Sequence, residues 1–304
     1  MTGPMQTRPG LTGTGENCWL DRHIISYAHQ GGAWEGPSST LFTIRQALQA
    51  GATGIELDVH ATSDRHLVVC HDTSVDRTTN GSGEISHMTL AELRQLDNAY
   101  WWAPGADVTP GLAPSEYPYR GRAPKDRDFG IATLSEALEL IDEFPGVVVN
   151  LDIKRTEPTV KSYEELLARE LEARGHTEDV IVASFLDKAT ATFRQIAPEI
   201  GTSAGTVGSA EFWRSVHTGE TLASVPYVAL QIPLEHAGVI VVDEALVAAA
   251  HAQGVAVHVW TIDDADVMSL LIDLGVDGII TDLPTTLCAL LEERGVAWRP
   301  HQPV

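Results

Sequence analysis

The chain has 304 residues, of which 43% are hydrophobic and 20% are charged, a composition typical of a globular protein with a sizeable core. Its formal net charge of −22 argues against nucleic acid or an anionic membrane as a partner. Three widely spaced cysteines, a polar N-terminus without an apolar signal region, and the lack of any apolar run of about 18 residues favour a cytoplasmic protein with no integral membrane association.

The predicted elements begin after an N-terminal arm of residues 1–22. From there, β-branched runs alternate with helix-forming segments and no linker interrupts them, so residues 23–304 are predicted to form a single domain. Thr89 and Thr133 each begin a capping box, and Gly275 follows a helical segment where a C-terminal glycine is expected. Candidate strands are 24–28, 54–59, 67–70, 147–153, 180–184, 227–232, 255–260 and 278–281, with 200–204 as a weaker candidate.

About eight strands in this length favour a (β/α)8 TIM barrel over an open sheet. Too few residues separate Val59 from Leu67 for a crossover helix, so we expect the barrel to be irregular between its second and third strands, or these strands to form a hairpin at its rim. Residues 98–130 are predicted to be an inserted loop or small subdomain, because Pro, Gly and aromatic residues crowd there. Its aromatic side chains either line a substrate mouth or pin the insert to the barrel; they are Trp101, Trp102, Tyr117 and Tyr119.

Two carboxylates in the second predicted strand are the most informative pair. Glu56 and Asp58 are two residues apart in an apolar run, so both point to the same face of a strand. Buried carboxylates are costly without a cation, and oxygen ligands suit Mg²⁺ or Ca²⁺. His71, at the end of the next apolar run, is a candidate for the proton transfer that a metal alone does not supply. This stretch therefore predicts half of an active site.

The ends of the other strands supply the second half, because TIM-barrel active sites lie at the C-terminal ends of the strands. Asp152 and Lys154 share a strand face, so Asp152 is a third metal ligand and Lys154 meets a substrate anion, or the two form only a buried salt bridge. His29 ends the first strand, and with His71 it would flank the carboxylates as general acid and general base. Trp260 either packs the core or forms an apolar wall for the substrate.

An ordered series of motifs resembles the glycerophosphodiester phosphodiesterase family. The motifs are Ala28-His-Gln-Gly-Gly32, Gly54-Ile-Glu-Leu-Asp-Val59, Val68-Val-Cys-His-Asp72, Asn150-Leu-Asp-Ile-Lys154, Val259-Trp-Thr-Ile-Asp263 and the segment from Gly275 to Asp282. The resemblance implies a (β/α)8 barrel that hydrolyses glycerophosphodiesters to glycerol 3-phosphate and an alcohol, using one divalent cation, Mg²⁺ or Ca²⁺. It also implies that the neighbouring glycerol hydroxyl attacks phosphorus and that water then opens the cyclic phosphate.

The resemblance also assigns roles to residues. His29 and His71 match the family's catalytic histidines, which act as general acid and base. The family's metal ligands are matched by Glu56, Asp58 and Asp152. A small-molecule phosphodiester is therefore the expected partner, in lipid or glycerol metabolism.

Four positions differ from the family pattern. Gln30 stands where the family has an arginine that contacts phosphate, and Ser38-Ser-Thr40 stands in place of Glu-Asn-Thr. Asp152 replaces a glutamate, and Asp263 replaces an asparagine. We expect Gln30, Lys154 and Trp260 to be the phosphate-binding and substrate-binding positions, with phosphate affinity the property that these changes affect most.

Two alternatives remain from the sequence. One is a phosphodiesterase that acts on lysophospholipids or other phosphodiesters, with the aromatic insert holding a lipid tail. The other is a catalytically weak ligand-binding relative in which Gln30 marks lost activity, although the retained histidines and acidic residues argue against it. The sequence leaves open the released alcohol, the choice between Mg²⁺ and Ca²⁺, and the oligomeric state.

Overall fold

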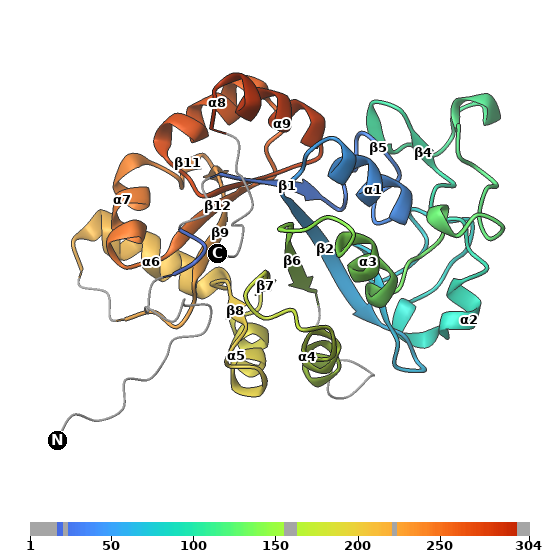
Figure 1. The fold of residues 1–304 in the computed structure, drawn as a ribbon, viewed down its shortest axis with the longest axis horizontal. Coiled ribbons are helices and arrows are strands. Elements are labelled where there is room, and N and C mark those ends of the chain that lie inside the picture. Colours follow the sequence, from blue (N-terminus) through green and yellow to red (C-terminus); the bar gives the residue numbers. More distant parts are fainter. Residues whose placement is uncertain (1–16, 21–23, 155–162, 221–223, 297–304) are drawn as a thin grey trace.

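The computed structural model describes residues 17–20, 24–154, 163–220 and 224–296. Eight parallel strands form a barrel with helices around it (Figure 1), which confirms the predicted (β/α)8 fold. Neighbouring strands follow the order β8-β7-β6-β2-β1-β13-β12-β9, and a parallel bridge between Ser203 and Ala229 joins the two ends of this order. The barrel strands are β1 (Ile25–His29), β2 (Gly54–Ala61), β6 (Val148–Ile153), β7 (Val180–Ala183), β8 (Gly201–Thr202), β9 (Ala229–Pro233), β12 (Ala256–Trp260) and β13 (Gly278–Thr281).

Helices connect successive barrel strands and pack on the outside. The predicted capping boxes are confirmed at Thr89 and Thr133, which begin α2 and α3, and α8 ends at Gly275 with a φ of 81°. Within the residues described, no helix is long and apolar enough to cross a membrane. The helices are α1 (Leu41–Gln49), α2 (Leu90–Leu93), α3 (Leu134–Ile141), α4 (Tyr163–Arg174), α5 (Asp187–Ile196), α6 (Thr206–Thr218), α7 (Glu244–Ala252), α8 (Ala265–Leu274) and α9 (Pro284–Glu293).

Side chains alternate between the two faces of each barrel strand, so in β2 and β6 the site carboxylates face the barrel interior while their apolar neighbours face the helices. In β2, Leu57 and Val59 belong to the core that packs against the surrounding helices, so Glu56 and Asp58 face the interior of the barrel. The same alternation in β6 turns Asp152 inward. Strand sequence alone thus directs these polar side chains into the barrel.

Residues 17–20, within the predicted N-terminal arm, pack onto the barrel. Trp19 is completely buried in the same cluster as Ile25 and Tyr27 of β1. The Asn17 side-chain amide donates hydrogen bonds to the carbonyl oxygens that precede β9 and β12, at 2.7 and 2.9 Å. These four residues therefore close the N-terminal end of the barrel, whereas residues 1–16 and 21–22 of the arm lie outside the described residues.

The irregularity expected after the second strand is present as a hairpin. Strand β3 (Leu67–Val69) pairs antiparallel with β2, with Val69 opposite Val59. Because β3 turns back at the rim, it does not count among the eight barrel strands. The set of eight is completed instead by β8, which the sequence marks only weakly. The short connection thus sends residues 70–72 across the C-terminal end of the barrel.

The insert at residues 98–130 lies beside α1, on the side of the barrel opposite α6 and α7 (Figure 1). The Trp102 indole N–H donates a hydrogen bond to the Ala33 carbonyl at 2.9 Å, and the Tyr119 ring stacks on Trp102 at 5.4 Å between centroids. Trp101 and Tyr117 pack around Arg120. These contacts favour pinning of the insert over lining of a substrate mouth. The insert contains β4 (Trp102–Ala103), β5 (Ala106–Val108) and 3₁₀ turns at Pro114–Glu116 and Arg127–Phe129; a further 3₁₀ turn, Ile85–His87, precedes it.

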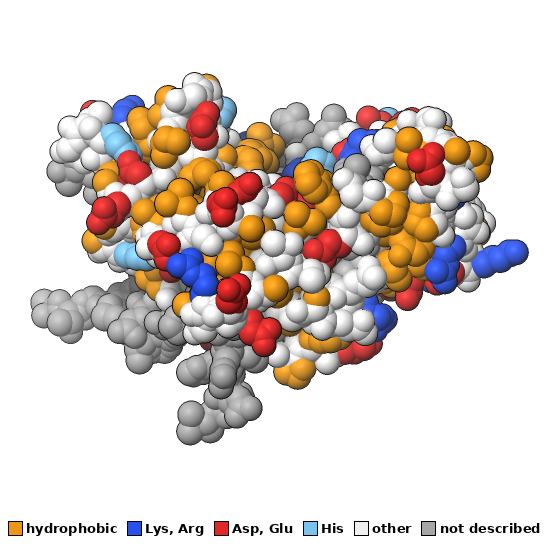
Figure 2. All heavy atoms as spheres, turned by 90° about the horizontal axis from the view of Figure 1, so that it is seen from above, with side chains coloured by type: hydrophobic (Ala, Val, Ile, Leu, Met, Phe, Trp, Pro, Cys, Tyr) orange, Lys and Arg blue, Asp and Glu red, His pale blue; other side chains and the backbone are white. Residues whose placement is uncertain are grey.

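The protein carries a strong excess of acidic over basic side chains. Asp and Glu outnumber Lys and Arg by 42 to 20 in the sequence. Figure 2 shows them spread across one face, with basic side chains in small separate groups. An anionic ligand must therefore be attracted by local positive charge rather than by the field of the whole protein.

His176 gives this fold a measurable dependence of stability on pH. The ring is buried between two carboxylates: Nδ1 lies 2.8 Å from Asp179 Oδ2, and Nε2 lies 3.3 Å from Asp142 Oδ1. The hydrogen bond with Asp179 raises the pKa of His176 above 6.5, although burial opposes this. Because folding favours the protonated ring, its contribution to the free energy of unfolding is complete below about pH 6.5 and is lost as pH rises through the raised pKa.

We therefore expect the free energy of unfolding, measured in urea, to fall less from pH 6 to pH 9 in His176→Gln than in the wild type. The matched control replaces the exposed His66 in the β2–β3 turn: in His66→Gln the free energy of unfolding should fall as much from pH 6 to pH 9 as in the wild type. Identical pH dependence in wild type and His176→Gln would contradict this prediction.

Candidate active site

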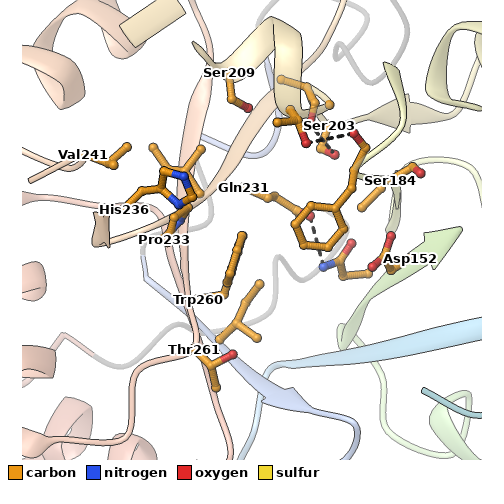
Figure 3. Close-up of a pocket in the computed structure, with 18 of the residues that line it drawn as sticks. Asp152, Ser184, Ser203, Ser209, Gln231, Pro233, His236, Val241, Trp260 and Thr261 are labelled. Atoms are coloured by element: carbon orange, nitrogen blue, oxygen red, sulfur yellow. Dashed lines mark hydrogen bonds between the residues drawn. The ribbon is translucent and has the colours of Figure 1, made fainter. Parts of the chain in front are cut away.

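A cavity of about 880 Å³ opens at the C-terminal ends of the barrel strands (Figure 3). Six of the eight predicted site residues line it: Trp260 and five residues with titratable side chains, which lie on or shortly after β1, β2, β3 and β6. These five are His29, Glu56, His71, Asp152 and Lys154. Strands far apart in the sequence thus bring the predicted charged groups to one place.

The strand register brings three carboxylates together. Asp58 of β2 lies directly opposite Asp152 of β6, and ligand oxygens of Glu56, Asp58 and Asp152 lie within 4.8 Å of one another. All three residues are buried, and Asp58 Oδ2 and Asp152 Oδ1 accept no hydrogen bond from any described residue. Burial, followed by the charge of Asp58, raises the pKa of Glu56 to about 8, and burial raises the pKa of Asp152. Joint ionisation of this cluster is therefore disfavoured until positive charge joins it.

Lys154 supplies part of that charge. Its Nζ lies 2.8 Å from Asp58 Oδ1 and 2.8 Å from Asp152 Oδ2, so the salt bridge considered from the sequence is present and includes a second carboxylate. Burial alone would lower the pKa of Lys154, but the carboxylates outweigh it and raise the pKa. Lys154 contacts Asp58 and Asp152 but not Glu56, whose Oε2 instead lies 3.8 Å from His29 Nε2. An all-oxygen donor set with unpaired buried oxygens fits a hard divalent cation such as Mg²⁺ or Ca²⁺.

Two histidines flank the carboxylates. The rings of His29 and His71 meet edge to face, with centroids 6.4 Å apart. His29 Nδ1 lies 2.6 Å from Asp282 Oδ1, and His71 Nδ1 lies 2.8 Å from Asp72 Oδ1. Because a carboxylate holds each Nδ1, the Nε2 atom of each ring is the one available to exchange a proton.

The carboxylate partners also set the charge of the rings. Burial lowers the pKa of His29, but the Asp282 hydrogen bond and the charge of Glu56 outweigh it and raise the pKa to about 9. The hydrogen bond with Asp72 raises the pKa of His71, against the opposing effect of burial. Asp282 had no assigned role from the sequence; its place just after β13 was the signal that marked it as a strand-end residue.

Asp263, one of the four positions that differ from the family pattern, holds Asp282 in place. Its Oδ1 accepts hydrogen bonds from the Asp282 backbone N–H at 2.7 Å and from the Thr281 hydroxyl at 2.9 Å. The acidic residue at this position therefore orders the segment that orients His29.

Gln30 lies beside His29 and is not among the described residues that line the cavity. Its φ of 52° is unusual for a residue other than glycine, and its side chain is buried. The backbone N–H donates to Glu56 Oε2 at 3.1 Å, and the side-chain amide nitrogen lies 3.2 Å from His29 Nε2. Gln30 thus contacts the site through Glu56 and His29.

Trp260 and a pair of amides complete the cavity wall. Trp260 lines the cavity, and its ring packs edge to face with Phe185 at 5.5 Å between centroids. The Asn150 side-chain N–H donates to Gln231 Oε1 at 3.3 Å, a contact between β6 and β9 that is drawn in Figure 3. The sequence predicts no role for either amide, because an inward-facing Asn or Gln on a strand has no distinctive spacing.

The site as a whole places three carboxylates that could hold a cation beside two histidine rings. Such a combination can neutralise an oxyanion while protons are taken from a nucleophile and given to a leaving group. The described geometry therefore suits hydrolysis of a phosphate ester.

Comparison with known proteins agrees with this chemistry. Residues 29–286 match the profile of the glycerophosphoryl diester phosphodiesterase family. A glycerophosphodiester phosphodiesterase of Caldanaerobacter subterraneus subsp. tengcongensis is 33% identical over 271 residues, covering 88% of this chain and 98% of that protein. The probable glycerophosphodiester phosphodiesterase 2 of Mycobacterium tuberculosis is 29% identical over 284 residues, covering 89% of this chain and 92% of that protein.

Solved structures show the same fold. A phosphodiesterase of Oleispira antarctica, in complex with the product sn-glycerol-3-phosphate, has a TM-score of 0.67 at 25% identity and covers 90% of this chain and 99% of that chain. The glycerophosphoryl diester phosphodiesterase domain of a protein from Mycobacterium tuberculosis has a TM-score of 0.72 at 20% identity, covering 89% of this chain and 99% of that chain. The second similarity establishes the barrel alone.

Proposed function

Since the chain belongs to the glycerophosphoryl diester phosphodiesterase family, it is an enzyme of the phosphoric diester hydrolase class, and we propose that it hydrolyses glycerophosphodiesters to glycerol 3-phosphate and an alcohol. The buried cluster of Glu56, Asp58 and Asp152 beside His29 and His71 is the observation that carries this proposal. The product held by the Oleispira antarctica enzyme supports glycerol 3-phosphate as the phosphate-bearing product.

We assign Glu56, Asp58 and Asp152 to one divalent cation, Mg²⁺ or Ca²⁺. The unpaired buried oxygens of Asp58 and Asp152 and the close grouping of the three carboxylates support this assignment. When bound, the cation neutralises the phosphoryl oxygens and lowers the pKa of the attacking hydroxyl. Lys154 faces the cavity from the same cluster and adds a point charge for the substrate phosphate.

The two histidines move the protons in this proposal. His29 keeps its proton to high pH, so we assign it the transfer of a proton to the oxygen of the leaving alcohol. His71 accepts the proton of the glycerol hydroxyl that attacks phosphorus. When water opens the cyclic phosphate, His29 takes a proton from water and His71 returns its proton to the glycerol oxygen. Asp282 and Asp72 hold the rings so that Nε2 remains the exchanging atom.

Turnover by the purified protein tests this function. Glycerophosphocholine, glycerophosphoethanolamine, lysophosphatidylcholine and an aryl phosphodiester would each be offered with Mg²⁺ or Ca²⁺. We expect release of glycerol 3-phosphate from the first two, loss of activity in EDTA, and recovery on addition of the cation. If no substrate is turned over with any divalent ion, the enzymatic proposal is wrong and the ligand-binding alternative is favoured. Full activity in EDTA would refute the metal assignment alone.

A further inference from the structure

The cavity has two chemically different halves that come from different halves of the chain. Apart from His236, its titratable lining residues lie on β1, β2 and β6 or just after β3 and β6. The other half is lined mainly by uncharged side chains, among them Ala210 and Trp213 of α6, Pro233 of β9, and Val239 and Val241. In Figure 3, Pro233, His236 and Val241 lie across the cavity from Asp152, with Gln231 and Trp260 between them.

A hairpin builds the outer wall of this apolar half. It consists of β10 (Glu235–His236) and β11 (Val239–Ile240), joined by a turn with positive φ angles at Ala237 and Gly238. Val239 and Val241 line the cavity, whereas Ile240 between them does not and is 54% exposed. The alternation of the strand therefore directs one apolar row at the cavity, and Val239 is left 48% exposed when nothing covers it.

The volume exceeds what the proposed substrates need. A cavity of about 880 Å³ holds roughly 30 groups of the size of a water molecule, at about 30 Å³ each. That is nearly twice the number of non-hydrogen atoms in glycerophosphocholine. A small glycerophosphodiester placed at the carboxylates and histidines would leave the apolar half exposed to water, which is unfavourable.

We propose that the apolar half binds the hydrocarbon chain of a lysophospholipid, a glycerophosphodiester that carries one acyl chain on its glycerol. The proposal rests on the proposed function, because the phosphodiester must lie between Lys154 and the two histidines. A chain that leaves this point toward α6 and the hairpin meets uncharged side chains and an opening to solvent. One chain is the limit, since the attacking glycerol hydroxyl must remain free.

The reaction balances with the groups already assigned. The phosphorus–oxygen bond to the head-group alcohol breaks, and a bond forms from phosphorus to the free glycerol hydroxyl oxygen. The hydroxyl proton passes to His71 and the departing alcohol receives a proton from His29. One water then opens the cyclic phosphate and restores both histidines. The products are the head-group alcohol and an acylglycerol phosphate.

Chain length is the variable that tests the proposal. Choline release would be measured with glycerophosphocholine and with 1-hexanoyl and 1-decanoyl lysophosphatidylcholine, each below its aggregation concentration. Burying one methylene group is worth up to about fourfold in binding, so we expect kcat/KM to rise at least roughly 100-fold from glycerophosphocholine to the decanoyl lipid. No rise, or a rise only above the aggregation concentration, would overturn the inference while glycerophosphocholine turnover leaves the proposed function standing. No choline from any substrate would instead defeat the proposed function.

A matched pair of variants locates the chain. Val239→Asp places a charge in the apolar half, and Ile240→Asp places the same charge on the outer face of the same hairpin. We expect Val239→Asp to lower kcat/KM for the decanoyl lipid at least tenfold more than for glycerophosphocholine. Ile240→Asp should leave the ratio of the two values within about twofold of the wild type. Equal effects of the two variants, with unchanged thermal stability, would exclude this half of the cavity as the chain site.

Discussion

Replacing His29 or His71 by alanine is expected to lower kcat for glycerophosphocholine by about 10²–10⁴-fold, the usual contribution of a positioned acid or base. The reason is geometric: the two rings are 6.4 Å apart, and each is held at Nδ1 by its own carboxylate, so neither ring is placed to make the transfer assigned to the other. Because neither histidine belongs to the carboxylate cluster, calorimetric titration with Mg²⁺ or Ca²⁺ should still show binding to both variants.

The matched control is His66→Ala, which removes an exposed histidine from the β2–β3 turn, away from the cavity. Its kcat should remain within about twofold of the wild type. Retention of full activity by either His29→Ala or His71→Ala would refute the role assigned to that ring. Loss of metal binding together with activity would instead show that the ring supports the cluster.

Asp58→Asn is expected to abolish binding of the divalent cation and to reduce turnover by more than about 10²-fold. Asp58 is completely buried, and its exchange for the isosteric amide removes one of three ligand charges without opening a cavity. In the wild type a cation at 100 times its Kd should stabilise the fold by about 2.7 kcal/mol. We expect this metal-dependent rise in Tm to disappear in the variant.

The metal-free variant supplies a readout that does not depend on activity. Removing one buried negative charge relieves repulsion from Glu56 and Asp152, and Lys154 keeps Asp152 as its partner. The Tm of metal-free Asp58→Asn should therefore equal or exceed that of the metal-free wild type. Asp266→Asn, at an exposed position on α8, is the control that should keep the full metal-dependent rise. A variant that still gains stability with the cation would remove Asp58 from the ligand set.

Much of the barrel follows from local sequence. Short β-branched runs identify seven of the eight barrel strands, and capping signals identify helices such as α2, α3 and α8, because strand and helix each impose their own period on apolar residues. The connection between Val59 and Leu67 is too short for the crossover helix that two parallel strands need. It therefore correctly indicates a hairpin. The weakest prediction, residues 200–204, became barrel strand β8 because β3 turns back and closure requires another neighbour for β7.

The candidate site, like the fold, has some features set by local sequence and others set by the pairing of distant strands. Alternation within β2 and β6 places Glu56, Asp58 and Asp152 on inward faces, which is a property of the strand and can be read from the sequence. That Asp58 stands opposite Asp152 depends on the register between two strands some 90 residues apart in the chain. The pairing of His29 with Asp282 joins the first and last strands and exists only in the closed barrel.

Local sequence patterns are enough to predict the fold class, the inward-facing acidic residues and the two strand-end histidines, because each depends on periodicity over a few residues. Tertiary packing, by contrast, sets which carboxylates meet, which partners orient the histidines, and that Gln30 lies beside His29. Tertiary packing also puts apolar side chains of α6 and the β10–β11 hairpin in the cavity lining, where the aromatic side chains of the insert were one of two sequence-based alternatives. These features depend on barrel closure and on how distant segments pack, and no local pattern of residues specifies either.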